Sequence, residues 1–444
     1  MIDDINHVLI LGCGQTGLSI ARHFKNDKKI YFYDESALVL NNAKNLFGTE
    51  KHLYFSGELQ EKFFDGVDLI GISPGIDPRH PLIKIAKKNG IKFHNDISLF
   101  FEENDLKETK VIAVTGTNGK TTVCSMIEQI ILESGLKAKI VGNIGVPILD
   151  IDHANNLNVL IVELSSFQLE VLDNAKIDVG IILNISDDHM DRYDSFINYF
   201  QAKAKLFNLA ETKIFNRDDD SLFPLRDKAS LSFGISKSKN EQDYTLTKID
   251  SASYIKMGGQ ASIDITSLKL IGEHNKFNLM AAIACIKSTL PKFDCFNINN
   301  LNGVDHRLEL VRNKKGIFFY NDSKATNVNA TITALKSFDK KNIFLIAGGE
   351  SKNQILKPLE KYLKKMVPSL YLIGQDADLF EENFNIIGSL MISKHGSMKD
   401  AVLAAYQDAH AGDIVLLSPA CASYDMYKNY KERGNEFKSV VDEL

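Results

Sequence analysis

A hydrophobic run at residues 111–114, followed by a glycine-rich turn and a helical stretch, constrains the fold more than any other feature. The turn, residues 116–122, reads GTNGKTT. A buried strand that leads through such a turn into a helix presents backbone N–H groups to a phosphate. Lys120 can reach the terminal phosphates, and Thr121 can hold Mg²⁺. Val114 stands where the general pattern has its first glycine. We nevertheless predict an ATP site in an α/β domain, against the alternative of an ordinary helix start with an exposed lysine.

Short apolar runs that read as strands alternate with helical stretches along the chain, which is typical of α/β architecture. We expect strands at residues 7–11, 30–33, 69–72, 111–114, 157–162, 179–183, 317–320, 343–347, 370–373 and 414–417. We expect helices at residues 17–24, 122–134, 275–288, 327–337, 398–410 and 424–433. Residues 244–270 are turn-rich, include Gly258-Gly259, and predict a small antiparallel meander.

Two changes in composition divide the chain, whose 444 residues are too many for one ordinary core. A charged stretch, FEENDLKETK, covers residues 101–110 and places a boundary near 95–105, and an asparagine-rich stretch covers residues 297–303. We therefore predict three consecutive α/β domains. They are a Rossmann-like N-terminal domain at residues 1–98, a P-loop ATP-binding central domain at 99–300, and a Rossmann-like C-terminal domain at 301–444.

Charge and composition exclude several classes of protein. The net charge of −5 gives no electrostatic reason to expect nucleic-acid binding. No apolar run reaches the ~18 residues that span a bilayer, and the first residues lack the basic start of a signal peptide. The cysteines are scattered, with no C-x-x-C pair: Cys13, Cys124, Cys285, Cys295 and Cys421. We expect a cytoplasmic protein with reduced thiols, without membrane insertion, disulfide framework or zinc site.

A second glycine-rich loop lies near the N-terminus. Residues 12–17 read GCGQTG between an expected strand and helix, and Asp34 follows at the end of the next strand. This pattern is typical of loops that bind NAD or another nucleotide diphosphate. The motif is weak by itself, so a tight turn without a ligand stays open as an alternative.

Phosphoryl transfer needs metal ligands, and two expected strands end in suitable residues. Glu163 directly follows the run at 157–162, where a carboxylate beside the P-loop can hold Mg²⁺. The run at 179–183 leads into the polar cluster NISDDHMDRY, residues 184–193, which contains His189 and Asp191. We predict His189 as a further metal ligand. The alternatives are an exposed carboxylate and a structural histidine.

Several motifs together resemble the Mur ligase family in order and spacing. They are GTNGKTT (116–122), NISDDHMDRY (184–193), GEHNKFN (272–278), HRLE (306–309) and NDSKATN (321–327). This resemblance implies an ATP-dependent amide ligase of bacterial cell-wall synthesis. Further segments are similar to the member that joins D-glutamate to UDP-N-acetylmuramoyl-L-alanine through an acyl phosphate: GCGQTGLS (12–19), SPGI (73–76), GNIGVP (142–147) and the stretch at 416–437.

The resemblance assigns the ATP and metal residues. It implies two Mg²⁺ ions and a carbamylated Lys203 in the sequence YFQAK, with Lys205 as the competing lysine. Implied catalytic residues are Lys120, His189 and Lys203, and implied metal ligands are Thr121, Glu163, His189 and Lys203. Implied ATP contacts are Gly116, Thr117, Asn118, Gly119, Lys120, Thr121, Thr122, Asn275, Asn278, Arg307, Asp322 and Lys324.

The resemblance also assigns the other two substrates. For the UDP-linked substrate it implies Gly14, Gln15, Thr16, Asp34, Ser36, Ser73, Pro74, Gly75, Asn143, Ser165 and Gln168. For D-glutamate it implies Thr326, Lys352, Ser423 and Tyr430. Cations and hydroxyls suit a small dianion, because charge-assisted hydrogen bonds contribute about 1.5–3 kcal/mol each. Tyr430 departs from the family, in which phenylalanine is usual.

Three other functions remain open from the sequence. The first is another ligase of the superfamily, for example one that adds glutamate to a folate. The second is an NAD-dependent oxidoreductase built on residues 12–17, and the third is a non-catalytic nucleotide-binding regulator. Our preferred interpretation is the D-glutamate ligase, acting as a monomer on ATP, D-glutamate and UDP-N-acetylmuramoyl-L-alanine.

Overall fold

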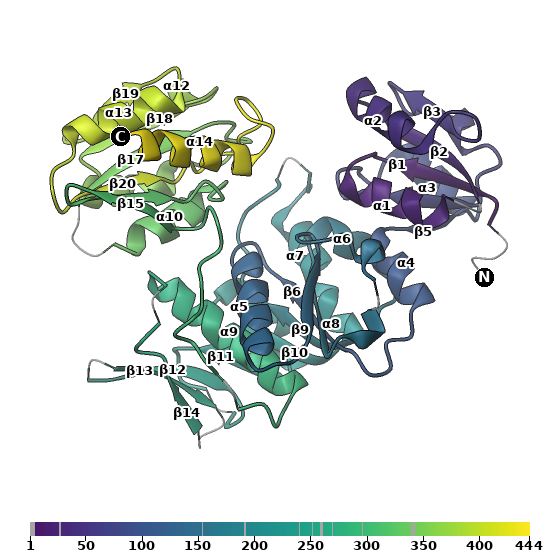
Figure 1. Cartoon of the computed structure of the whole chain (residues 1–444), viewed down its shortest axis with the longest axis horizontal. Coiled ribbons are helices and arrows are strands. Elements are labelled where there is room, and N and C mark those ends of the chain that lie inside the picture. Colours follow the sequence, from purple (N-terminus) through teal and green to yellow (C-terminus); the bar gives the residue numbers. More distant parts are fainter. Residues whose placement is uncertain are drawn as a thin grey trace.

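The computed structural model describes residues 5–25, 28–152, 154–190, 192–238, 240–250, 252–257, 261–268, 270–294, 296–338 and 342–444. These residues form three α/β lobes in chain order, with the central lobe between the other two (Figure 1). The predicted class of three consecutive α/β units is confirmed. Asp191, Gly258, Gly259 and Cys295 lie outside the described residues.

The first lobe has a five-stranded parallel sheet in the order β3-β2-β1-β4-β5. Its strands are β1 (His7–Leu11), β2 (Lys29–Asp34), β3 (Leu53–Ser56), β4 (Leu69–Ile72) and β5 (Lys92–His94). Its helices are α1 (Gln15–Phe24), α2 (Ala37–Phe47) and α3 (Pro81–Lys88), with a 3₁₀ turn at Glu61–Phe64. The strand order reverses between β1 and β4, so the loops after these two strands lie side by side, where such sheets bind ligands.

The central lobe has a nine-stranded sheet in the order β14-β13-β12-β11-β10-β9-β6-β8-β7, antiparallel only at β12-β13-β14. Its strands are β6 (Lys110–Thr115), β7 (Ala138–Gly142), β8 (Val159–Glu163), β9 (Ile177–Ile182), β10 (Ala210–Asn216), β11 (Leu231–Gly234), β12 (Tyr244–Ile249), β13 (Ala252–Met257) and β14 (Ala261–Asp264). The predicted meander is confirmed. The helices are α4 (Asp96–Glu103), α5 (Lys120–Glu133), α6 (Ser166–Val171), α7 (Phe196–Ala204), α8 (Leu206–Leu209) and α9 (Glu273–Thr289), with 3₁₀ turns at Ile148–Asp150, Ala154–Asn156 and Asp220–Lys228.

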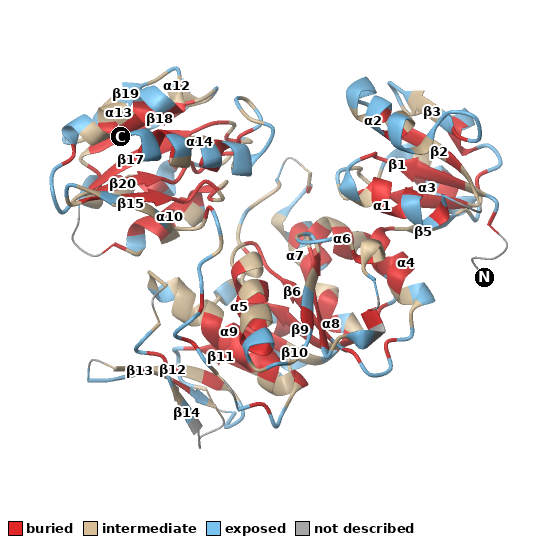
Figure 2. Cartoon of the chain, in the orientation of Figure 1, coloured by how far each residue is buried: buried red, intermediate tan, exposed pale blue. Residues whose placement is uncertain are grey.

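Strand β6 forms the centre of this lobe and is buried on both faces. Ile112 and Val114 pack with α5 and α9, whereas Val111 and Ala113 pack with α6, α7 and α8. Successive residues of a strand point to opposite faces, so an uninterrupted apolar run is needed when helices cover both. Figure 2 shows this pattern as buried strands covered by helices that are buried or intermediate over most of their length, α5 and α9 among them.

The third lobe has a six-stranded sheet in the order β15-β16-β20-β17-β18-β19. Its strands are β15 (Glu309–Lys314), β16 (Ile317–Asn321), β17 (Ile343–Gly348), β18 (Ser369–Ile373), β19 (Met391–Lys394) and β20 (Ile414–Leu417). Its helices are α10 (Val328–Lys336), α11 (Glu360–Met366), α12 (Ala377–Phe384), α13 (Met398–Asp408) and α14 (Tyr430–Glu443), with a 3₁₀ turn at Lys357–Leu359. Because β20 lies between β16 and β17, the loops that leave these three strands are neighbours.

One predicted helix is wrong. Residues 424–433 were expected to be helical, but α14 begins only at Tyr430 and continues to Glu443. The side chain of Asn429 accepts hydrogen bonds from the N–H groups of Lys431 (2.9 Å) and Glu432 (3.1 Å), which caps the helix at that point. Residues 424–428 therefore form a loop. Other ends shift by two residues: α1 begins at Gln15, α5 at Lys120, α9 at Glu273, β8 at Val159 and β9 at Ile177, and α13 ends at Asp408.

The sheets change between residues 94 and 110 and again between 289 and 309, and the domain limits at 98 and 300 remain a prediction. The four described cysteines are buried and form no disulfide. Among the described residues, no helix has both the length and the apolar character needed to cross a membrane.

Candidate functional site

The glycine-rich loop after β6 is held by the loop after β9. The N–H of Thr117 donates to the Asn184 carbonyl (2.8 Å), and the side chain of Asn184 makes hydrogen bonds of 2.8 and 2.9 Å with the backbone of Asn118. Gly119 has a φ of 88°, and a Cβ there would lie 2.9 Å from Asn278 Oδ1. Only glycine fits this conformation and this approach. The loop has the shape of an anion-binding turn at the start of α5.

Lys120 lies folded over this loop. Its ammonium donates to the carbonyls of Gly116 (2.7 Å) and Thr117 (2.9 Å). Burial lowers its pKa, the charge of Glu163 opposes that shift, and Arg307 reinforces it. Lys120 therefore rests on neutral carbonyls, which an incoming phosphate can replace with a stronger, charge-assisted contact.

An oxygen-donor group lies beside the loop at the end of β8. The Thr121 hydroxyl donates to Glu163 Oε2 (3.0 Å), and the Asn143 amide donates to Glu163 Oε1 (2.8 Å). Within the part of the chain that the structure describes, no three His, Cys, Asp or Glu side chains gather to hold a metal ion. Mg²⁺ is usually bound by one or two carboxylates together with phosphate oxygens and water. The Thr121–Glu163 pair fits such an ion.

Lys203 on α7 is 2% exposed, an unusual burial for a lysine. Its Nζ donates to the Gly116 carbonyl (3.0 Å) and lies 4.8 Å from the centre of the Tyr199 ring. Burial and the charge of Lys120 hold its pKa well below the ordinary value. The competing Lys205 instead contacts Asp173 (2.7 Å) and the Glu170 carbonyl. Geometry therefore favours Lys203 over Lys205 at the site.

His189 lies on the loop after β9, with a φ of 57°. Its ring contacts the ring of Phe167 at a centroid distance of 4.9 Å. The preceding Asp188 accepts a hydrogen bond from the Asn327 amide of the third lobe (3.2 Å). We did not predict Phe167, Asp188 or Asn327 as site residues. The dense polar cluster at 184–193 could have marked Asp188 as a site residue. The contact between Asp188 and Asn327 joins two lobes, and no local sequence pattern indicates it.

A cavity of about 310 Å³ lies between the central and third lobes. It brings together predicted residues from both lobes: Thr117, Asn118, Lys120, Thr121, Asn143, Glu163, Ser165, His189, Lys203, Arg307, Lys324, Thr326, Lys352, Ser423 and Tyr430. All four residues assigned to D-glutamate are among them. The Lys324 ammonium lies 3.9 Å from the centre of the Tyr430 ring, a contact that phenylalanine would also provide.

A larger cavity of about 640 Å³ adjoins it and is lined by Asn275, Asn278, Arg307 and Asp322. Arg307 lines both cavities, and its Nε is buried without a hydrogen-bond partner. Such an orphaned donor suits an anion between the cavities. Burial raises the pKa of Asp322 to about 7. His274, which we did not predict, also lines this cavity, and burial lowers its pKa to about 4.

The residues predicted for the UDP-linked substrate divide into two groups, and most lie in the first lobe. Asp34 accepts from the N–H groups of Cys13 (2.8 Å) and Ser36 (2.9 Å), and Ser73 donates to the Gly12 carbonyl (2.8 Å). The Asp34–Cys13 bond joins the end of β2 to the loop after β1, and the Ser73–Gly12 bond joins the loops after β1 and β4. Gly14, Gln15 and Gly75 are exposed there, and Thr16 and Pro74 are partly exposed.

Asn143 and Ser165 instead line the smaller cavity. Gln168 is buried and forms the capping box of α6 with Ser165 (3.0 and 3.2 Å). Its side chain therefore has a structural contact within the central lobe.

Arg433 on α14 is a site-shaping residue that we did not predict. It is 1% exposed, and its guanidinium donates to the Ser323 hydroxyl (3.0 Å) and to the carbonyls of Ser323, Cys421 and Ala422 (2.8–3.1 Å). It ties together the loops that carry Lys324 and Ser423. From the sequence alone, an arginine in the stretch at 416–437 cannot be distinguished from an ordinary surface charge, because its burial depends on the fold.

Replacement of Arg433 with methionine is expected to lower the free energy of unfolding of the third lobe by about 3 kcal/mol, because buried carbonyls lose their donors. Hydrogen exchange of the α14 amides in increasing urea measures this change. Lys431→Met on the exposed face of the same helix serves as the control, and an equal effect of both changes would contradict the assignment.

Family models match all three lobes. The model described as "Mur ligase MurD-like, N-terminal domain" matches residues 6–94, "Mur ligase middle domain" matches 114–286, and "Mur ligase, glutamate ligase domain" matches 306–421. The chain belongs to the Mur ligase family.

Named relatives agree with this membership, and a solved structure has a similar fold. The chain is 35% identical to the UDP-N-acetylmuramoylalanine–D-glutamate ligase of Nitrosomonas europaea, with 98% of this chain and 95% of the relative covered. It is 37% identical to the enzyme of the same name from Shewanella oneidensis, with 98% of each covered. The fold is similar to that of the MurF ligase of Thermotoga maritima, at a TM-score of 0.61 and 15% identity, with 100% of this chain and 97% of that chain covered.

Proposed function

We propose that this protein is an ATP-dependent ligase that adds D-glutamate to UDP-N-acetylmuramoyl-L-alanine in peptidoglycan precursor synthesis. The observation that carries the proposal is the cavity between the lobes, where the phosphate-binding loop faces Thr326, Lys352, Ser423 and Tyr430. Full-length relatives with this activity in their name support it.

The reaction needs two steps, because a carboxylate is a poor electrophile. An oxygen of the L-alanyl carboxylate attacks the γ-phosphorus of ATP, the bond to ADP breaks, and an acyl phosphate forms. The neutral amine of D-glutamate then attacks the acyl carbon, phosphate leaves, and the amine loses a proton. Lys120 neutralises charge on the transferred phosphoryl group, while the cavity aligns the three reactants.

Two Mg²⁺ ions belong to this proposal. Thr121 and Glu163 would hold one ion, and His189 and a carbamylated Lys203 would hold the other. When bound, the ions neutralise phosphate oxygens during transfer. Lys203 suits carbamylation because burial lowers the pKa of its amine, which favours the neutral form that reacts: Nζ adds to the carbon of CO₂ and releases a proton, and a carbamate anion results.

The nucleotide base and ribose occupy the larger cavity in this proposal, with Asn275, Asn278 and Asp322 around them and Arg307 on the phosphates. The UDP group lies at the loops after β1 and β4, in a first domain with limits at 1–98. The proposed enzyme acts as a monomer. We place the enzyme in the cytoplasm, where ATP is available.

ATP-analogue binding is expected to take up protons at about pH 8. Burial, followed by Arg307, lowers the pKa of Lys324 to about 7, so its neutral amine predominates at that pH in the free protein. Bound phosphates favour the ammonium form and raise this pKa, so uptake disappears below about pH 6, where Lys324 is already protonated. Calorimetry in buffers of different ionisation enthalpy measures the uptake. Lys324→Met should remove most of it, and unchanged uptake would contradict this origin.

The decisive experiment is an assay of amino-acid-dependent phosphate release with UDP-N-acetylmuramoyl-L-alanine, ATP and D-glutamate. We expect turnover with D-glutamate and a product heavier by one glutamyl residue. Turnover only on a folate would replace the proposal with the related glutamate ligase. Nicotinamide-dependent redox activity that survives Lys120→Ala would identify an oxidoreductase.

A further inference from the structure

The loop that carries His189 contacts both neighbouring lobes. We define the β9 exit loop as residues 187–190 and 192–194. Asp188 contacts Asn327 of the third lobe (3.2 Å), and Arg192 contacts the first lobe. The loop therefore responds to the position of each outer lobe.

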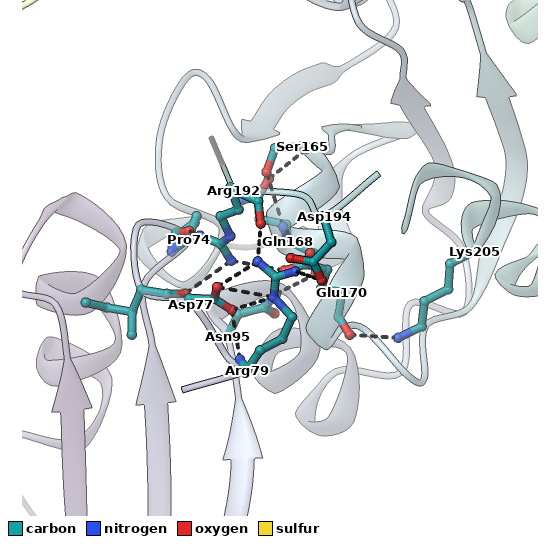
Figure 3. A network of polar contacts seen from close by, with 11 residues as sticks. Pro74, Asp77, Arg79, Asn95, Ser165, Gln168, Glu170, Arg192, Asp194 and Lys205 are labelled. Carbon is teal, nitrogen blue, oxygen red and sulfur yellow. Dashed lines mark hydrogen bonds and ion pairs between the residues drawn. The ribbon is translucent and has the colours of Figure 1, made fainter. Parts of the chain in front are cut away.

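Arg192 makes the principal contact with the first lobe (Figure 3). Its guanidinium donates to the carbonyls of Pro74 (2.7 Å) and Ile76 (3.2 Å), and to Glu170 Oε2 of α6 (3.0 Å). The side chain is 10% exposed, so water screens these contacts little. Arg79 reaches back from the first lobe to the Arg192 carbonyl and is itself oriented by Asp77 at 2.8 and 3.0 Å.

Phe167 links Arg192 to His189. The Arg192 guanidinium lies 4.1 Å from the centre of the Phe167 ring, and the His189 ring lies 4.9 Å from the same centre. Phe167 also borders a narrow crevice with Ser73, Pro74 and Ile76 of the first lobe. The Arg192 guanidinium and the Phe167 ring thus form a chain of contacts from residues 73–77 to the His189 imidazole.

We propose that Arg192 is a positioning residue that couples the 73–79 loop of the first lobe to His189, so that docking of the first lobe sets the imidazole at the cavity. The inference rests on the proposed function for the role of His189. A second link between these lobes, Arg22 on α1 with Asp150, lies on another part of the interface and touches neither Phe167 nor the β9 exit loop.

Arg192→Lys tests the coupling, because lysine keeps the charge but loses the planar, multidentate contacts. Hydrogen exchange of amides 187–190, measured without any ligand, should become about tenfold faster in this variant. With substrates, kcat should fall about 10–100-fold, a magnitude typical of residues that orient metal ligands, while the KM for D-glutamate changes less than about twofold. Arg22→Lys, whose side chain is 46% exposed, should change neither quantity by more than about twofold.

A double-mutant cycle with Phe167→Leu sharpens the test. If both residues act through one path, the double variant Arg192→Lys with Phe167→Leu should have a kcat no lower than that of the more damaged single variant. Additive losses, unchanged exchange in Arg192→Lys, or an equal effect of Arg22→Lys would overturn the coupling. If Arg192→Lys does not fold, Glu170→Gln should also accelerate the hydrogen exchange of amides 187–190. Unchanged exchange in Glu170→Gln would then overturn the coupling. Failure of the wild-type chain to form product would instead reject the proposed function, since the exchange comparison needs no substrate.

Discussion

Lys120→Ala is expected to abolish ligation, with kcat lower by at least about 10³-fold, because one positioned cation on the transferred phosphoryl group contributes that much or more. The ammonium rests on the carbonyls of Gly116 and Thr117, directly over the loop that would receive the phosphates. Its removal leaves the loop itself intact, since Asn184 holds the backbone of Asn118.

Single-turnover measurement of acyl-phosphate formation and of ADP release checks this expectation. Lys139→Ala, an exposed lysine on β7 of the same sheet, is the matched control and should retain activity within about twofold. Hydrogen exchange of β6 and α5 should match the wild type in both variants. Activity of Lys120→Ala within tenfold of the wild type would remove the phosphate-binding role of this loop.

Lys203→Ala is expected to be the second most damaging change, again by about 10³-fold in kcat, because a carbamate on Lys203 would be an anionic metal ligand. Formate or acetate should restore part of the activity by placing a carboxylate in the space that the side chain vacates. Rescue should saturate with carboxylate concentration and should not occur with chloride.

Lys205→Ala provides the control, since Lys205 contacts Asp173 and Glu170 rather than the loop carbonyl. That variant should be active within about twofold and should not respond to formate. Full activity of Lys203→Ala without any carboxylate would show that the lysine or its role is misassigned. Labelled bicarbonate trapped on the wild-type chain by alkylation gives an independent readout of the modification.

Sequence reasoning predicted the central strand β6, its loop and the meander because each has a local signal. An uninterrupted apolar run, a glycine-lysine turn and alternating short strands are readable without knowledge of the fold. The start of α14 at Tyr430 was not predicted, since residues 424–428 contain no glycine or proline to mark a break and Asn429 acts as a cap only in one backbone conformation.

Contacts between lobes escaped prediction for a different reason. Asp188 meets Asn327 across 139 positions of sequence, and Arg192 meets Pro74 across 118. Within the third lobe, Arg433 likewise contacts the Ser323 carbonyl across 110 positions. Residue type and spacing carry no information about such pairs, whereas the order of strands in each sheet does.

In all three sheets, the loops discussed above leave the carboxyl ends of neighbouring strands where the strand order reverses. The third sheet presents its share of the cavity from the loops after β16, β17 and β20, which carry Lys324, Lys352 and Ser423. In the proposed function, these three loops would hold D-glutamate, whereas the loops after β6 and β8 would hold the phosphates and a metal ion. In the proposed site, a change of these loops would alter the amino-acid preference without harm to ATP use only if Lys324 is kept, because Lys324 also contacts ATP there.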